Sequence, residues 1–458
     1  MRDFLPSDVR KRNYVIGIIK EVYESYGFEP LETPSVENLE TLTGKYGEEG
    51  NQLIFKILKR GEKLDASASE KDLSDLALRY DLTVPLARVV ANNKNDLPKF
   101  FKRYQIQPVW RADRPARGRY REFYQCDVDA IGSSSMIVEA ELCAAVSEIL
   151  EKLGFKDFEI RLNHRKILSG LLTISGIEEG KQPDAITAID KLDKIGVEGV
   201  MSEFQSRTIS TDSGKKILSQ FTHIRNFWEK YNWKREEWNE RFVKSTGNLS
   251  DTYHLEGIIL TLDDLITINE FASALSNQKR IRFDPTLARG LSYYTGAIFE
   301  INVPDLAGSL GGGGRYDDLI GMFGKEQIPA CGFSLGLERI LVVMEERGMF
   351  PKELSENSAD VMVTIWNEES TGESLKLAAE LRSQNLRVLV YPEADKLGKQ
   401  FKYADSIKIP FVCVLGESEL AENKVTLKNL RTGEQETIEQ RQVAEKIKEF
   451  GRNLTDER

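Results

Sequence analysis

Two strand-like stretches, residues 100–110 and 122–131, flank a short loop rich in arginine, proline and glycine. Two such stretches joined by a short loop predict an antiparallel β-hairpin. On the second stretch, Phe123, Gln125 and Asp129 are separated by even numbers of residues, so their side chains share one face of the sheet. The hairpin therefore predicts a surface that combines an aromatic ring, an amide and a carboxylate beside the arginines of the loop.

The hairpin is basic although the whole chain is acidic. The formal net charge is −10 at pH 7, which argues against general affinity for nucleic acid, DNA included. Residues 100–121 nevertheless contain one acidic residue, Asp113, and seven basic ones: Lys102, Arg103, Arg111, Arg114, Arg117, Arg119 and Arg121. Guanidinium groups hold phosphate oxygens at two points. This concentration of charge favours focused phosphate binding over non-specific coating of DNA. Composition alone would favour a merely solvated, arginine-rich hairpin, so the prediction depends on the order of the residues.

Length and composition set the broad class. A chain of 458 residues that is 40% hydrophobic predicts two or three domains. It has no apolar run that could span a bilayer and no secretory signal at its start, so no membrane role is expected. The four cysteines and three histidines are widely scattered, which predicts neither a disulfide framework nor a metal site and favours a reducing cytoplasm.

The rhythm of the chain changes twice. Residues 174–257 have helical periodicity and few strand signals, which predicts a helical insertion. The glycine run 311–314 suggests by itself only a flexible turn. After residues 350–358, which fit a linker, strand and helix patterns alternate and predict a separate small α/β domain.

Three further motifs could carry chemistry. Asp81 and Thr83 lie two apart and, on an extended segment, would point the same way and hold an ammonium group; a helix N-cap is the alternative. Arg339 falls early in a predicted helix, where the dipole favours phosphate. Tyr293 and Tyr294 could equally be ordinary strand aromatics, one facing inward and one outward.

Taken together, four blocks resemble the histidyl type of class II aminoacyl-tRNA synthetases. These blocks are VWRADRPARGRYREFYQCDVD (109–129), LARGLSYYTGAIFE (287–300), GFSLGLERIL (332–341) and RYDLTVPLAR (79–88). The resemblance covers essentially the whole chain. Pro34 matches the proline that this family places at a dimer interface, so the resemblance implies a homodimer.

The resemblance also implies a fold and a domain plan. Residues 1–345 would form an α+β catalytic core on a mostly antiparallel sheet, the class II synthetase fold, with residues 174–257 as a helical insertion. Residues 346–358 would be a linker, and residues 359–458 an α/β domain that binds the anticodon. Lys396, Lys399 and Lys402 could contact tRNA there, or could simply form a solvated helix face.

Site residues follow from the same resemblance. Catalytic roles fall to Arg111 and Arg289. The histidine-binding set would be Asp81, Leu82, Thr83, Arg111, Gln125, Asp129, Arg289, Tyr293 and Tyr294. The ATP-binding set would be Arg111, Asp113, Arg119, Phe123 and Arg339. Mg²⁺ would be held mainly by the nucleotide. Ser292 stands where the family usually has aspartate, which implies a lost hydrogen bond behind Arg289.

The implied activity is ATP-dependent ligation of L-histidine to its tRNA through a histidyl-adenylate, in the cytoplasm. The alternative is a synthetase-like subunit of histidine biosynthesis that senses histidine; such subunits lack the C-terminal domain. A synthetase-like nucleic-acid sensor would need an attached kinase, which the sequence does not encode. A synthetase for another amino acid of the subclass is disfavoured by the block at 287–300.

Overall fold

The computed structural model describes residues 1–44, 46, 51–61, 73–238, 252–276, 280–288, 293–324, 326–351, 354 and 359–456, with the backbone alone for 252–256 and 451–456. Six of the thirteen residues of the expected linker 346–358 (352, 353 and 355–358) therefore lie outside the described residues. The chain divides into two compact units. The first comprises Met1–Phe4 and Arg12–Met349, and the second comprises Leu5–Lys11 and Phe350–Arg458.

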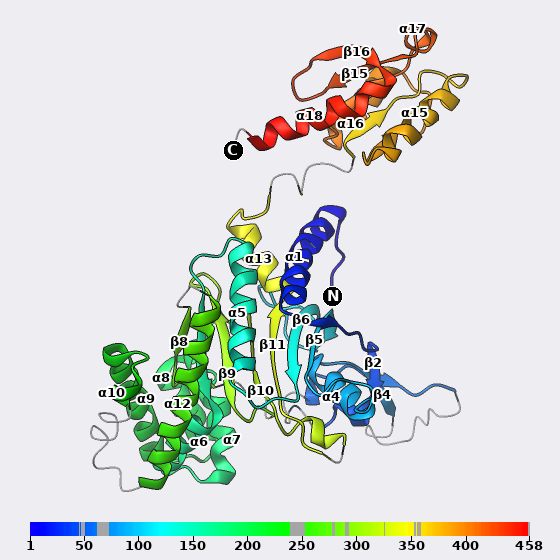
Figure 1. The fold of residues 1–458 in the computed structure, drawn as a ribbon. Helices are drawn as coiled ribbons and strands as arrows, with labels where there is room; N and C mark the ends of the chain where they lie inside the picture. The colour runs from blue at the N-terminus through cyan, green and yellow to red at the C-terminus, as the bar shows by residue number, and fades with distance from the viewer. Residues whose placement is uncertain are drawn as a thin grey trace. The chain divides into compact units, whose positions relative to one another are not determined.

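The first unit is built on a sheet in which, among the described residues, eight strands pair (Figure 1). Only the edge pairings, β1 with β5 and β8 with β7, are parallel. This confirms the expected mostly antiparallel core. In order across the sheet, the strands are β1 (Glu29–Pro30), β5 (Phe101–Trp110), β6 (Glu122–Ile131), β11 (Ala330–Gly336), β10 (Gly311–Arg315), β9 (Ala297–Asn302), β7 (Glu159–His164) and β8 (Ile281–Phe283).

The predicted hairpin is confirmed as β5 and β6, which pair from Phe101 opposite Ile131 to Trp110 opposite Glu122. On the even-numbered face of β6, Cys126 and Val128 are fully buried. On that side of the hairpin, the Tyr23 hydroxyl of α1 (Pro6–Ser25) donates to the Cys126 carbonyl oxygen at 3.3 Å. The helices α5 (Ile137–Lys152) and α13 (Leu337–Glu346) also pack against β6 and β11. The odd-numbered face of β6 remains for the site.

The glycine run corrects a prediction. Residues Gly311–Arg315 form β10, a strand between β9 and β11, and not a flexible turn. A Cβ on Gly313 would lie 2.0 Å from the Gly332 carbonyl oxygen, and one on Gly311 would lie 2.4 Å from that of Ser334. The neighbouring backbone thus excludes side chains here, which is why glycine stands in a strand interior.

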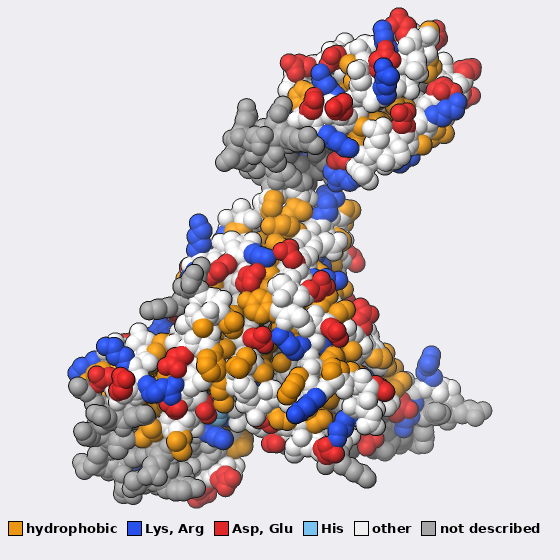
Figure 2. Space-filling model, viewed as in Figure 1, with side chains coloured by type: hydrophobic (Ala, Val, Ile, Leu, Met, Phe, Trp, Pro, Cys, Tyr) orange, Lys and Arg blue, Asp and Glu red, His pale blue; other side chains and the backbone are white. Residues whose placement is uncertain are grey.

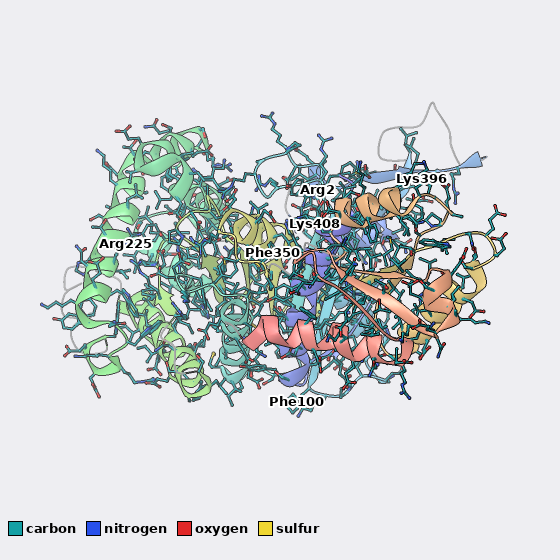
Figure 3. The ribbon with its side chains drawn as sticks, turned by 90° about the horizontal axis from the view of Figure 1, so that it is seen from above. Arg2, Phe100, Arg225, Phe350, Lys396 and Lys408 are labelled. Atoms are coloured by element: carbon teal, nitrogen blue, oxygen red, sulfur yellow. The ribbon has the colours of Figure 1, made fainter. Side chains whose placement is uncertain are left out.

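Helices make up the described part of the predicted insertion, as expected, but they extend beyond its predicted ends. They are α6 (Arg165–Ile174), α7 (Gln182–Ile189), α8 (Leu192–Ser206), α9 (Thr211–Tyr231), α10 (Arg235–Glu237) and α12 (Thr252–Leu275). Helix α12 packs against α5 and α6, and Arg225 of α9 lies among these helices (Figure 3). Within the described part of the chain, no helix combines the length and hydropathy needed to cross a bilayer.

A small three-stranded sheet and one helix lead into the hairpin. Its strands, in order, are β2 (Val36–Asn38), β4 (Ser74–Leu78) and β3 (Lys56–Leu58). After β4 the chain passes through residues 79–82 into α4 (Thr83–Asn92), with α2 (Leu39–Leu42) packed nearby. This arrangement places Tyr80 and Asp81 close to the hairpin.

The second unit has its own sheet, and its alternating pattern confirms the predicted α/β rhythm. The sheet order is β13 (Val388–Val390), β12 (Val361–Val363), β14 (Phe411–Val414), β15 (Lys424–Asn429) and β16 (Gln435–Glu439). The first three strands are parallel and the last two antiparallel. The helices are α15 (Thr371–Ser383), α16 (Leu397–Ser406), α17 (Glu417–Ala421) and α18 (Val443–Asp456).

His164 has a structural role that makes a stability prediction. Its Nδ1 accepts a hydrogen bond from the Lys166 backbone N–H at 3.1 Å, and burial lowers the pKa of His164 to about 3. As pH falls below about 6.5, the unfolded chain binds a proton that the folded one does not, so stability is lost from there downward. His164→Asn keeps an acceptor without this titration.

Urea unfolding of the first unit should show the difference. Between pH 7 and pH 5 the wild type should lose about 2 kcal/mol more unfolding free energy than His164→Asn. Equal losses in both proteins would contradict the assignment.

Candidate active site

Arg111 lies directly after β5, and its side chain contacts a backbone carbonyl group and two aromatic rings. Its Nε donates to the Tyr80 carbonyl oxygen at 2.9 Å. Its guanidinium carbon lies 4.3 Å from the centre of the Tyr80 ring and 5.2 Å from that of Phe123. The structure thus brings together the arginine and the aromatic side chain that the resemblance assigns to ATP, with the guanidinium positioned by cation–π contacts.

Asp81 and Thr83 do not lie on an extended segment, which corrects that prediction. Thr83 is the first residue of α4 and Leu82 is its N-cap residue. Asp81, one residue earlier, accepts a hydrogen bond at Oδ1 from the Val84 backbone N–H at 3.1 Å, so its carboxylate serves the start of the helix, close to the N-cap alternative. Asp81 also accepts from the hydroxyls of Tyr46 at 2.9 Å and Tyr293 at 3.4 Å. Burial raises the pKa of Asp81, and these hydrogen bonds oppose the rise.

Leu82, between them, is fully buried. Its carbonyl oxygen accepts from Arg103 at 3.5 Å. The Tyr293 hydroxyl is also hydrogen-bonded to Thr83. Asp81 and Thr83 therefore converge on one tyrosine hydroxyl, although not by the strand geometry expected.

The odd-numbered face of β6 carries the predicted amide and carboxylate. Gln125 Nε2 donates to Ser334 Oγ at 3.0 Å. Asp129 is 2% exposed, pairs with Arg103 at 2.8 Å and accepts a hydrogen bond from the Tyr316 hydroxyl. Burial raises the pKa of Asp129, and Arg103 opposes that rise.

Glycine makes room for Asp129. A Cβ on Gly332, its partner on β11, would lie 1.9 Å from Asp129 Oδ1. The space that the Asp129 carboxylate fills is therefore created by a missing side chain on the next strand.

Both tyrosines of the 293–294 pair are buried, so the alternative with one facing outward is wrong. Their ring centres lie 5.0 Å apart, and Tyr293 lies 6.1 Å from Tyr316. A Cβ on Gly314 would lie 2.9 Å from the Tyr294 ring. The second glycine-rich strand thus also makes room for the site.

The basic residues of the hairpin serve several purposes, which corrects the simple phosphate-binding interpretation. Arg103 is fully buried against Asp129, and Lys102 pairs with Glu141 at 3.1 Å. On the loop, Arg117 pairs with Glu346. Three of the seven basic side chains therefore form ion pairs within the fold.

Asp113 and Arg119, both assigned to ATP by the resemblance, lie together on the hairpin loop. Arg119 Nε is 3.8 Å from the Asp113 carboxylate. Arg121 donates to the Asp113 carbonyl oxygen at 3.3 Å. The loop therefore presents one acidic and two basic groups side by side.

Arg339 is the third residue of α13 and donates to the Ser309 carbonyl oxygen. A Cβ on Gly118 would lie 3.1 Å from Arg339 Cγ, so this side chain lies directly against the hairpin loop. Its neighbour Glu338 accepts from the Tyr124 backbone N–H at 2.9 Å and pairs with Arg12 at 3.2 Å. These contacts fix the start of α13 beside β6.

Arg289 and Ser292 lie outside the described residues, so their assignments stay predictions. Sequence reasoning missed Tyr46 and the two partners of Asp129, Arg103 and Tyr316. Arg103 had one signal, since its even spacing from Gln105 and Gln107 places it on the polar face of β5. Nothing local in the sequence reveals that Tyr316 reaches β6. Among the described residues, no three His, Cys, Asp or Glu side chains group as metal ligands.

The antiparallel sheet, with its arginine, ring and carboxylates on one face, is the core of a class II aminoacyl-tRNA synthetase. The histidyl-tRNA synthetase family model matches residues 1–340, and an anticodon binding domain model matches residues 360–450. The chain belongs to the histidyl-tRNA synthetase family.

Individual relatives agree with this assignment. The chain is 43% identical over 453 residues to the histidine–tRNA ligase of Christiangramia forsetii, with 96% of each chain covered. The crystal structure of histidyl-tRNA synthetase from a Nostoc species matches with a TM-score of 0.77 and 33% identity, covering 98% of this chain and 97% of that one.

A Bacillus halodurans structure described as an ATP phosphoribosyltransferase regulatory subunit/histidyl-tRNA synthetase shares the fold. Its TM-score is 0.68 at 22% identity, and the match covers 91% of this chain and 97% of that one.

Proposed function

We propose that this chain ligates L-histidine to its tRNA at the expense of ATP, through a histidyl-adenylate, as a step of protein synthesis. The observation that carries the proposal is the buried Asp129, held by Arg103 and Tyr316 on the strand face that also bears Gln125 and Phe123. It supports recognition of an imidazole ring next to a nucleotide site, in a chain whose relatives are histidine–tRNA ligases.

In the first step, a carboxylate oxygen of histidine attacks the α-phosphorus of ATP, and the bond to the bridging oxygen breaks to release pyrophosphate. We assign the negative charge that builds on the α-phosphate to Arg111 and Arg289, because preorganised cations stabilise such charge strongly. Phe123 stacks on adenine with Asp113 at its amino edge, while Arg119 and Arg339 hold the outer phosphates.

Histidine is recognised by polar pairing. We assign Asp129 to one ring nitrogen and Tyr294 to the other, with Asp81, Leu82, Thr83, Gln125 and Tyr293 around the amino group and the ring. A site of this kind rejects apolar analogues by roughly 10⁴ or more, because they would leave its buried polar groups unpaired.

In the second step, a ribose hydroxyl of the terminal adenosine of the tRNA attacks the carbonyl carbon of the adenylate and AMP leaves. We propose that residues 1–345, including the insertion 174–257, perform the chemistry. Residues 346–358 form the linker, and residues 359–458 bind the anticodon. A histidine-sensing regulatory subunit is disfavoured, because such subunits lack the C-terminal domain that residues 360–450 match here.

Lysines of α16 are one candidate contact for the tRNA. Lys396, labelled in Figure 3, is the residue directly before the helix, and Lys399 is paired with Asp395 at 2.9 Å. In the view of Figure 2, positive and negative side chains are interspersed over this unit. The charge pattern therefore supports a solvated helix face at least as well as a phosphate-binding surface.

The remaining parts of the proposal concern assembly and ions. We propose a cytoplasmic homodimer whose interface includes Pro34, an exposed residue in the single chain. Mg²⁺ would be bound mainly by the phosphates of ATP, since the described residues offer no cluster of ligands for a protein-held ion. We assign no step to a metal held by the protein.

Exchange of labelled pyrophosphate into ATP tests the proposal. It should require histidine, and histidine alone among the amino acids. Exchange stimulated equally by glycine, proline or threonine, or no exchange at all, would overturn it.

A further inference from the structure

A row of alternating rings and guanidinium groups joins the first residues of the chain to the hairpin. The guanidinium carbon of Arg2, labelled in Figure 3, lies 4.1 Å from the centre of the Tyr120 ring and 4.6 Å from that of Phe4. The guanidinium carbon of Arg12 lies 4.0 Å from the centre of the Phe4 ring and 4.5 Å from that of Tyr124. Each cation thus contacts two rings, and we refer to these five residues as the N-terminal stack.

Further polar contacts fix both ends of the N-terminal stack. At one end, Arg2 Nη1 donates a hydrogen bond to the Tyr120 hydroxyl at 3.0 Å. At the other end, Arg12 is 8% exposed and forms an ion pair with Glu338 at 3.2 Å. Glu338 in turn accepts a hydrogen bond from the Tyr124 backbone N–H at 2.9 Å. The stack is therefore attached to the hairpin loop, to β6 and to the first turn of α13.

The N-terminal stack lies next to the residues that the proposed function assigns to ATP. Three residues of the stack or of its polar contacts are sequence neighbours of that set: Tyr120 beside Arg119, Tyr124 beside Phe123, and Glu338 beside Arg339. Successive side chains of a strand point to opposite faces, so the Tyr124 ring lies on the far side of β6 from Phe123. The stack thus supports these side chains from behind, through the backbone that they share with it.

Arg2 is the member of the N-terminal stack whose loss the fold should tolerate. It is exposed, whereas Arg12 is buried in an ion pair. Substitutions of exposed residues usually change stability little, whereas breaking a buried ion pair is strongly destabilising. A change at Arg2 therefore tests the position of the hairpin loop without a loss of folding.

We propose that Arg2 is a positioning residue for ATP binding, acting through Tyr120 on the hairpin loop that carries Arg119. The proposal rests on the proposed function and adds to it a contribution from the start of the chain. A loop that is restrained before ATP arrives loses less conformational freedom when ATP binds, so the affinity for ATP is higher. Gln125 and Asp129, assigned to histidine, are held by contacts with β11 and β5, so histidine binding should not depend on the stack.

The test is Arg2→Ala in pyrophosphate exchange, with ATP and histidine varied in turn. The KM for ATP should rise about 3- to 10-fold, the effect of losing a cation–π contact, while the KM for histidine and the thermal midpoint stay the same. Lys99→Ala is the matched control, because Lys99 lies 5.0 Å from the centre of the Phe100 ring at the opposite end of β5; it should change neither KM. An unchanged KM for ATP in Arg2→Ala would overturn the proposal, and so would an equal rise in both KM values.

A double-mutant cycle shows whether Arg2 acts through Tyr120. Tyr120→Ala should raise the KM for ATP by a factor similar to that of Arg2→Ala. Combining the two changes should cause no further rise, because both remove the same contact. Tyr120→Phe keeps the ring and loses only the hydroxyl, so it should recover most of the affinity for ATP. Independent effects that multiply in the double variant would overturn the assignment to Tyr120.

Tryptic cleavage of the hairpin loop gives a second readout that does not depend on activity. Because a released loop is cut more readily, cleavage within residues 114–121 should be faster in Arg2→Ala than in the wild type or in Lys99→Ala. Equal cleavage rates would overturn the restraint of the loop by Arg2. If the wild type shows no histidine-dependent exchange, the proposed function fails, and the cleavage rates still decide whether Arg2 holds the loop.

Discussion

Asp129→Ala should raise the KM for histidine in pyrophosphate exchange by about 100-fold or more, while the KM for ATP changes less than about threefold. The reason is that the proposed function assigns the carboxylate to the imidazole and Phe123, six residues away on the same strand, to the adenine. Steady-state exchange with each substrate varied in turn measures both constants. Equal losses for the two substrates would contradict the division of the site.

Stability must be separated from recognition in this experiment. Asp129 is the ion-pair partner of the fully buried Arg103, and removing one member of a buried pair costs about 3–5 kcal/mol. Asp129→Asn keeps the packing and the hydrogen bond from Tyr316, so it is the companion variant. It should still raise the KM for histidine at least about tenfold, with a smaller fall in thermal midpoint than the alanine variant.

Arg111→Ala should reduce the rate constant of adenylate formation by about 10²- to 10³-fold. The guanidinium is held by the Tyr80 carbonyl and two ring faces, and no ion pair of Arg111 is found among the described residues, so the fold should tolerate its loss. Single-turnover formation of histidyl-adenylate measures the effect, and thermal unfolding checks the fold.

Two matched variants sharpen the result. Arg111→Lys keeps the charge but loses the two-point geometry, so it should recover only part of the rate. Arg121→Ala removes an exposed arginine that donates to a loop carbonyl, and it should cost less than about tenfold. A rate for Arg121→Ala as low as that for Arg111→Ala would show that net charge, and not position, matters.

The sequence predicts those parts of the fold that depend on local patterns. The β5–β6 hairpin, the helices between 174 and 257 and the α/β rhythm after residue 359 follow from residue spacing, and the structure confirms them. The glycine strand β10 escapes such reasoning, because a run without side chains has no periodicity. Its strand character depends on the backbones of β9 and β11.

The site divides in the same way. Strand alternation places Phe123, Gln125 and Asp129 on one face correctly. The partners of Asp129 come from distant parts of the chain, and the sequence does not indicate that Tyr316 lies against it. The sequence leaves two alternatives for Asp81, an extended segment or the start of a helix, because spacing alone does not distinguish them.

The glycines of β10 and β11 have a consequence for changing the amino acid that is accepted. At Gly314 and Gly332, which border the proposed histidine site, a methyl group would meet the Tyr294 ring or the Asp129 carboxylate. Only main chain is present at these two positions, so no substitution there can create more space. On the proposed assignment, room for bulkier amino acids has to come from shortening Asp129 or Tyr294, the groups assigned to the two ring nitrogens, or Tyr316, which donates to Asp129.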